Sequence, residues 1–353
     1  MQVDYIIVGQ GLCGSLLSWY LQQEGKAVLV IDNGTPDSAS MVAAGVINPI
    51  TGRRYVASWM IDELIRFAKP AYAAFGKELE TTLIVEKDLI DFFPSPQMRD
   101  AFVNRITEDD TYLHSYPDQN HFNQYFHYDF GCGKVDPVYT VFIDALLAGW
   151  RRKLTDIQCL KEEAFDTGQV RMENGAVQYK DVWAEKIIFC EGAAAMVNPW
   201  FGLLPFSAVK GEALIIRCEG LTNEHIYKRG LVVVPLAQEH TYWVGSNYLW
   251  EFDDTAPSAH FLHKTKEHLE HWLKPSFEVI AHKAAVRPAT IERRPFVGLH
   301  PHHPQIGILN GMGTKGASLA PLFAHQLAQH LVYGFPIMNE ANVSRFTRIL
   351  SHT

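Results

Sequence analysis

The sequence lacks paired cysteines, long hydrophobic runs and any excess of positive charge. Its five cysteines are odd in number and scattered without a CxxC pair, so we expect buried, reduced thiols rather than a disulfide framework. No segment approaches the length of about eighteen apolar residues that a membrane span needs. The first predicted strand begins at residue 3, which leaves no room for a signal peptide. We therefore expect a cytoplasmic protein.

The charge and the histidines exclude two further classes of site. The net charge of −8 argues against direct binding to nucleic acid, which depends on clustered cations at the phosphates. The histidines between residues 260 and 271 have mixed spacing and no HExxH pattern, so they fit a solvated helix face better than a metal site. We predict no metal and no direct binding of nucleic acid.

What the chain does contain is a strand–turn–helix–strand unit at Val3–Asp32. A short apolar run is followed by Gly9-Gln10-Gly11-Leu12-Cys13-Gly14, then by leucines at helical spacing, and then by a second apolar run that ends on Asp32. In this pattern, Gly9 allows a tight turn, Gly11 lets a pyrophosphate approach the backbone, and Gly14 allows close helix–strand packing. The acid at the end of the second strand accepts hydrogen bonds from a ribose. The unit predicts dinucleotide binding.

The C-terminal third repeats the same kind of turn. The apolar run at 306–310 leads into Gly311-Met312-Gly313-Thr314-Lys315-Gly316 and then into an amphipathic helix. Two glycine turns at opposite ends of the chain suggest one long ligand held at two places. Between them, the apolar run Val182–Phe189 predicts a buried strand. Short apolar runs separated by turn residues at 82–130 and 211–245 predict antiparallel strands.

Two adjacent arginines, Arg53 and Arg54, follow the first unit at a turn. Such a pair is most often solvated surface, but this one could line a pocket for an anion. A further arginine, Arg287, stands in Val286-Arg287-Pro288 ahead of Arg294-Pro295-Phe296-Val297-Gly298.

These motifs together, with Ala43-Ala44-Gly45 and Val209-Lys210-Gly211-Glu212, resemble the D-amino acid oxidase superfamily over nearly the whole chain. The resemblance implies an α/β, two-domain fold, in which a Rossmann-type FAD-binding domain packs on a mainly antiparallel-sheet substrate domain. It implies that residues 1–80, 135–200 and 285–353 form the FAD-binding domain, and that residues 81–134 and 201–284 form the substrate domain.

The resemblance also implies site residues. Arg287 would clamp the substrate carboxylate, because a guanidinium binds a carboxylate through two hydrogen bonds, and Arg53 and Arg54 lie near the place of other substrate-binding arginines. The Glu163-Ala164 backbone would contact adenine, and Lys315 would lie near the pyrimidine edge of the flavin. The residues expected at the cofactor are Gly9, Gly11, Gly14, Asp32, Ser40, Ala43, Ala44, Ala164, Gly192, Gly311, Gly313, Lys315 and Gly316.

The implied activity is oxidation of the C–N bond of an amino acid or secondary amine, by hydride transfer to flavin N5 of a non-covalently bound FAD. The electron acceptor is oxygen or another acceptor that the sequence does not identify. One alternative is an FAD-dependent 2-hydroxy acid dehydrogenase that passes electrons to a quinone or a protein. Another is a flavin module in modification of a tRNA wobble base.

Overall fold

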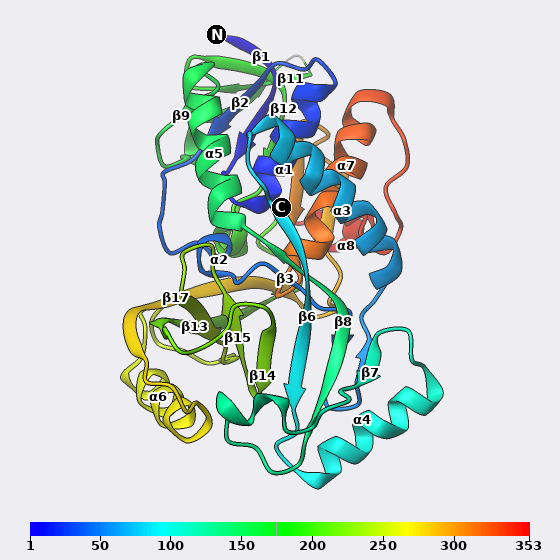
Figure 1. Cartoon of the computed structure of the whole chain (residues 1–353). Helices are drawn as coiled ribbons and strands as arrows, with labels where there is room; N and C mark the ends of the chain where they lie inside the picture. Colours follow the sequence, from blue (N-terminus) through cyan, green and yellow to red (C-terminus); the bar gives the residue numbers. More distant parts are fainter. Residues whose placement is uncertain (174) are drawn as a thin grey trace.

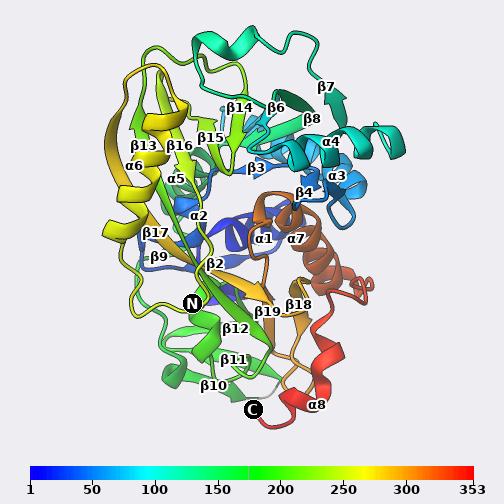
Figure 2. The ribbon, with the colours of Figure 1, turned by 90° about the horizontal axis from the view of Figure 1, so that it is seen from below.

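The structure, a computed structural model, describes residues 1–173 and 175–353 and contains two sheets that face each other across the centre of the molecule (Figures 1 and 2). The first sheet is built around β1 (Gln2–Val8), which pairs in parallel with β12 (Val182–Phe189) on one side and with β2 (Val28–Ile31) on the other. The remaining strands of this sheet are β9 (Leu160–Lys161), β10 (Val170–Glu173), β11 (Ala176–Tyr179), β18 (Phe296–Leu299) and β19 (Ile306–Asn310).

The continuous apolar character of β1 is explained by burial on both faces. Tyr5 and Ile7 point into one hydrophobic cluster, whereas Ile6 and Val8 point into another on the opposite face. Because side chains alternate along a strand, only an uninterrupted apolar run can satisfy both clusters. Helices cover the first face, namely α1 (Leu12–Gln23), α3 (Ile61–Glu78), α5 (Ile143–Asp156) and α7 (Gly316–Tyr333) (Figure 1).

The second sheet is mainly antiparallel. Its strand order is β17-β13-β16-β15-β14-β6-β8-β3, with β7 paired to β8, and only β14 and β6 run in parallel. Its strands are β3 (Val46–Ile47), β6 (Ile84–Phe92), β7 (Leu113–Ser115), β8 (Cys132–Val141), β13 (Phe206–Arg217), β14 (Ile226–Arg229), β15 (Leu231–Pro235), β16 (Thr241–Gly245) and β17 (Glu278–Thr290).

Short elements complete the chain. The helices α4 (Pro96–Glu108) and α6 (Ala259–Trp272) lie at the outside of the second sheet, and α2 (Ala39–Val42) lies between the two sheets (Figure 2). A small hairpin joins β4 (Ile50–Thr51) to β5 (Val56–Ala57), and α8 (Thr347–Leu350) lies near the C-terminus.

The predicted fold class is confirmed, and most element predictions hold. The strand at Val182–Phe189 has the predicted bounds. The region 82–130, predicted to form antiparallel strands, begins with one long strand, β6, which continues past a bulge between Lys87 and Leu89. The division of the chain into an FAD-binding and a substrate domain stays a prediction.

Among the described residues, no helix is both long enough and apolar enough to cross a membrane.

Candidate active site

A cavity of about 1190 Å³ is lined by residues of both sheets and of the segments between them. That volume exceeds the range of roughly 300–1,000 Å³ typical of pockets for one small molecule, so a cofactor and a substrate can share it. The turn after β1 and the turn before α7 both reach this cavity, although they stand at opposite ends of the sequence.

The three glycines of the first turn have different surroundings. A side-chain carbon on Gly14 would lie 1.9 Å from the Gly9 carbonyl oxygen, and one on Gly9 would lie 2.6 Å from the Cys190 carbonyl oxygen. Both are therefore needed for backbone packing. The corresponding carbon on Gly11 would meet only the side chain of Ser40, with Oγ at 3.2 Å, and Gly11 lines the cavity. Apart from this contact, the absence of a side chain at Gly11 leaves cavity space at the N-terminus of α1, where a phosphate is stabilised by free N–H groups.

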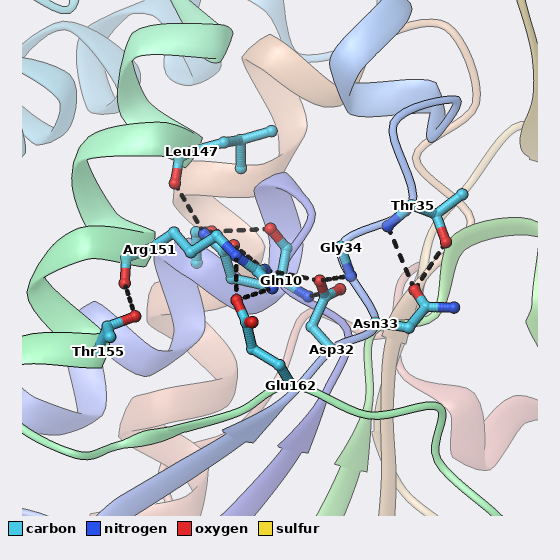
Figure 3. Close-up of polar contacts among 10 residues, drawn as sticks. Gln10, Asp32, Asn33, Gly34, Thr35, Leu147, Arg151, Thr155 and Glu162 are labelled. Carbon is cyan, nitrogen blue, oxygen red and sulfur yellow. Dashed lines mark hydrogen bonds and ion pairs between the residues drawn. The ribbon is translucent and has the colours of Figure 1, made fainter.

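Asp32 lies at the end of β2 and lines the same cavity (Figure 3). Its carboxylate accepts hydrogen bonds from the backbone N–H groups of Gln10 and Gly34, both at 2.8 Å. Arg151 of α5 donates to Asp32 Oδ1 at 2.8 Å and to Glu162 Oε1 at 2.7 Å. These contacts fix the orientation of the carboxylate, which retains acceptor capacity for a ribose hydroxyl.

Five of the other residues expected at the cofactor also line the cavity, as does Glu191. Ser40 accepts a hydrogen bond from the Leu12 N–H at 3.1 Å, which ties α2 to the start of α1. Glu191 precedes Gly192, and burial raises the pKa of its carboxyl to about 7. The lining includes Ser40, Ala43, Ala44, Ala164, Glu191 and Gly192.

The second glycine turn reaches the cavity only in part. Gly313 and Gly316 line it, and Gly316 is the first residue of α7. Gly311 instead packs against the protein, because a side-chain carbon there would lie 2.7 Å from Thr290 Cγ2. Lys315 points its ammonium at the Ser58 hydroxyl, and burial lowers its pKa. Gly14, Gly311 and Lys315 are not among the lining residues, so their contact with a cofactor stays a prediction.

Arg287 projects from β17 into the cavity. Its guanidinium donates to Ser246 Oγ at 2.8 Å and to the Asn247 carbonyl oxygen at 3.2 Å, and it lies 5.0 Å from the centre of the Tyr248 ring. Among the described residues no carboxylate pairs with it, and burial lowers its pKa. A half-buried cation without a counter-ion is partly desolvated, and an anionic ligand in the cavity would offset that cost.

A buried carboxylate, Glu212, supports the loop that holds Arg287. It accepts hydrogen bonds from the Asn247 amide at 3.0 Å and from the Ser258 backbone N–H at 2.6 Å. In return, the Asn247 side-chain oxygen accepts from the Glu212 N–H at 2.7 Å. These contacts fix the backbone of Asn247, whose carbonyl oxygen orients the guanidinium.

Arg53 and Arg54 are exposed on the turn between β4 and β5, and neither belongs to the cavity lining. The Arg54 carbonyl oxygen accepts a hydrogen bond from Arg105 at 3.4 Å. The structure therefore brings Arg287 to the cavity and leaves these two arginines outside it, so their role in substrate binding stays a prediction.

The sequence interpretation missed several polar groups of the cavity. Arg151, Glu191, Lys228 and Tyr248 all line it, yet none stands in a glycine motif. Glu191 offered a signal, because it follows a predicted buried strand directly. Lys228 and Tyr248 offered none, since single polar residues in antiparallel strands and loops are usually exposed.

The residues present fit FAD. The open space beside Gly11, the oriented carboxylate of Asp32 and the glycine turn before α7 all face one cavity that is large enough for a dinucleotide. When bound, FAD supplies acceptance of a hydride from the substrate.

Similarity to known proteins agrees with an FAD site in this cavity. Residues 149–330 match the family described as FAD dependent oxidoreductase. The chain is 26% identical to a glycine oxidase of Pseudomonas putida over 368 residues, which cover 97% of this chain and 98% of the relative. The fold is similar to the crystal structure of a glycine oxidase from Geobacillus kaustophilus, with a TM-score of 0.79 and 21% identity over 95% of this chain and 96% of that one. It is also similar to an iminodiacetate oxidase from a Chelativorans species, with a TM-score of 0.76 and 18% identity over 96% of this chain and 98% of that one. Since the family match spans more than half of the sequence, the chain belongs to the family of FAD-dependent oxidoreductases and is an enzyme that uses FAD.

Proposed function

We propose that this enzyme oxidises the C–N bond of an amino acid or a secondary amine that carries a carboxylate. The observation that carries the proposal is the guanidinium of Arg287, which faces the cavity and has no counter-ion among the described residues. The names of the similar proteins, glycine oxidase and iminodiacetate oxidase, support the same substrate class.

In this proposal Arg287 binds the carboxylate through paired hydrogen bonds and so fixes the substrate against the flavin. Tyr248 packs against the guanidinium and restricts its movement. The apolar side chains of Val232, Val234 and Trp243 line the cavity and exclude water from the reacting carbon. The neutral amine would give up a hydride from the carbon next to nitrogen, for which bound FAD would be the acceptor, while the nitrogen lone pair forms the C=N bond. Water then hydrolyses the iminium product to a carbonyl compound and a free amine or ammonia.

Anaerobic mixing tests the substrate class. The flavinated enzyme is combined with a panel of amino acids in both enantiomers, N-alkyl glycines and 2-hydroxy acids, and loss of the oxidised flavin absorbance is followed. We expect bleaching by amines that carry a carboxylate and none by the matched 2-hydroxy acids. Bleaching by hydroxy acids alone would replace the proposal with a 2-hydroxy acid dehydrogenase.

Aerobic turnover tests the electron acceptor. We propose oxygen, so turnover should consume oxygen and release peroxide in equal amounts. A rate that depends on an added quinone or on a protein acceptor, with no peroxide formed, would contradict oxygen as acceptor and would leave the C–N chemistry intact.

A further inference from the structure

Besides Arg287 and Arg151, which pairs with Asp32 and Glu162, the cation Lys228 lines the cavity, far from Arg287. Lys228 lies on β14 and Arg287 on β17, and three strands of the same sheet separate them. Neighbouring strands are about 4.8 Å apart, so the two backbones are separated by up to roughly 19 Å across the sheet. The two side chains therefore face one cavity from well-separated positions.

Lys228 is held by a buried carboxylate behind it. Its ammonium lies 2.7 Å from Asp91 Oδ2, and Asp91 is the residue directly opposite Lys228 in the β14–β6 pairing. The Asp91 side chain is 3% exposed and does not line the cavity, whereas the Lys228 side chain is 28% exposed and does. The ion pair is thus oriented with its positive end toward the cavity.

The ring of Tyr55 restricts Lys228 from another side. The ammonium lies 5.6 Å from the centre of this ring, and Tyr55 is fully buried. An ammonium has three N–H donors, and among the described residues only Asp91 accepts from Lys228. Donors therefore remain for a ligand in the cavity.

The walls around Lys228 are apolar. Ile50, Leu89, Val232 and Val234 line the cavity and belong to the same hydrophobic cluster as Tyr55. The carboxylates of the lining lie on other segments: Asp32, Asp37, Glu163 and Glu191 adjoin the expected cofactor contacts, and Glu212 is engaged by Asn247 and Ser258. An anion beside Lys228 would meet a positive charge and an aliphatic wall.

We infer that Lys228 forms a distal anion subsite, and that the substrate carries a second anionic group several bonds from the carbon that is oxidised. The inference rests on the proposed function and narrows its substrate class to amino acids or amines with two anionic ends. Arg287 binds the carboxylate next to the reacting centre, the apolar walls hold the connecting chain, and Lys228 binds the far end.

Equilibrium binding tests the subsite without turnover. The flavinated enzyme is titrated by calorimetry with linear dicarboxylates of increasing length and with the monocarboxylate of each length. We expect one range of lengths at which the dicarboxylate binds roughly 10- to 100-fold tighter, the range for a hydrogen bond to a charged group. Lys228→Met should abolish that advantage and Lys228→Arg should largely retain it.

Two further variants control for the loss of the Asp91 partner and for the loss of positive charge elsewhere in the sheet. Lys228→Met alone leaves Asp91 buried without a partner, so the same loss is measured in Asp91→Asn/Lys228→Met, where no buried charge remains. Lys283→Met removes a lysine of the same sheet that does not line the cavity, and it should leave the dicarboxylate preference unchanged. Equal affinity for dicarboxylates and monocarboxylates in the parent enzyme would overturn the subsite.

Anaerobic flavin reduction separates the two hypotheses. Amino acids with a distal carboxylate or phosphonate are compared with isosteres that end in a methyl group. Reduction by both sets at equal rates overturns the subsite and leaves the proposed function standing. If no amine reduces the flavin but dicarboxylates still bind through Lys228, the proposed function fails and the subsite stands.

Discussion

At the scale of single residues, Arg287 decides whether a substrate is held. Its guanidinium is half-buried and is oriented by Ser246 and Asn247, so it needs little reorganisation to receive a carboxylate. We expect Arg287→Ala to lower kcat/KM by an amount that corresponds to a loss of about 2–4 kcal/mol of transition-state stabilisation. The FAD content should stay unchanged. Arg287→Lys should recover part of the loss, because it restores the charge without the paired donors. Flavin reduction at low substrate that is as fast as in the parent would show that Arg287 is structural.

The Glu191 carboxyl, which lines the cavity, should make the stability of the protein depend on pH. Burial raises the pKa of its carboxyl to about 7, above the value of an unfolded chain, so the folded state binds the proton more tightly. The protonated Glu191 carboxyl therefore stabilises the folded protein. This stabilisation is complete below the pKa that Glu191 has in the unfolded chain, and it is lost as the pH rises from that value toward 7. For the FAD-free protein, we expect the free energy of unfolding to fall by about 2–3 kcal/mol over that interval relative to Glu191→Gln.

Urea unfolding of both proteins across this pH range measures the difference. Glu185→Gln, at an exposed position of the neighbouring strand, serves as the control and should follow the parent. Parallel pH curves for the parent and Glu191→Gln would contradict the predicted contribution.

At the scale of elements, the turn between β1 and α1 separates folding from cofactor binding. Gly11 has a φ of −70°, and a side-chain carbon there would contact only the Ser40 side chain, with Oγ at 3.2 Å, so a small shift of Ser40 makes a side chain compatible with the fold while it projects into the cavity. Gly11→Val should yield folded protein without flavin. Gly14→Val should fail to fold, since its side chain would collide with the Gly9 carbonyl. Circular dichroism and the flavin absorbance of purified protein give the two readouts, and a fully flavinated Gly11→Val protein would contradict the assignment.

The pairing of β13 with β17 explains why position 211 on β13 is a glycine. A side-chain carbon on Gly211 would lie 2.0 Å from Arg287 Nη2, so only glycine lets the guanidinium lie across β13. We expect Gly211→Ala to displace Arg287 and to lower kcat/KM about tenfold or more with FAD retained. In an Arg287→Ala background the same change should have little further effect, which a double-mutant cycle measures. Additive losses would mean that Gly211 acts independently of Arg287.

At the scale of the whole molecule, FAD should act as a stabilising link between the two sheets. The cavity is lined from both, and among the described contacts beside it the Trp243 indole of the second sheet donates to the Val42 carbonyl oxygen of α2 at 2.8 Å. We expect acid precipitation to release FAD, and FAD at about a hundredfold excess over Kd to stabilise the apoprotein by about 2.7 kcal/mol. Chemical unfolding with and without FAD measures this, and FMN, which lacks the adenosine half, should stabilise far less. Flavin that remains attached to acid-precipitated protein would contradict non-covalent binding.

Two of the five cysteines, Cys13 and Cys159, are half-buried and the others are buried, and all five are free thiols. Burial raises the pKa of Cys13 to about 12, so this thiol beside the cavity stays protonated and is a poor nucleophile. The expectation of reduced thiols is consistent with this arrangement.

The sequence by itself determined the nucleotide-binding turn. This turn depends on residues close together in the chain: Gly9, Gly11, Gly14 and Asp32 act within one unit, so local spacing is sufficient to predict it. The fold class and the identity of the cofactor followed from the resemblance of the sequence motifs to a known family. Arg287 came from family resemblance rather than from spacing. Tertiary structure decided which polar side chains reach the cavity. Arg151 and Asp32 are 119 residues apart, and Lys228 and Asp91 are 137 apart. Lys228 lies at the cavity because pairing of β14 with the distant strand β6 sets the face on which its side chain lies. Arg53 and Arg54 lie outside the cavity because the hairpin of β4 and β5 carries them on its exposed turn.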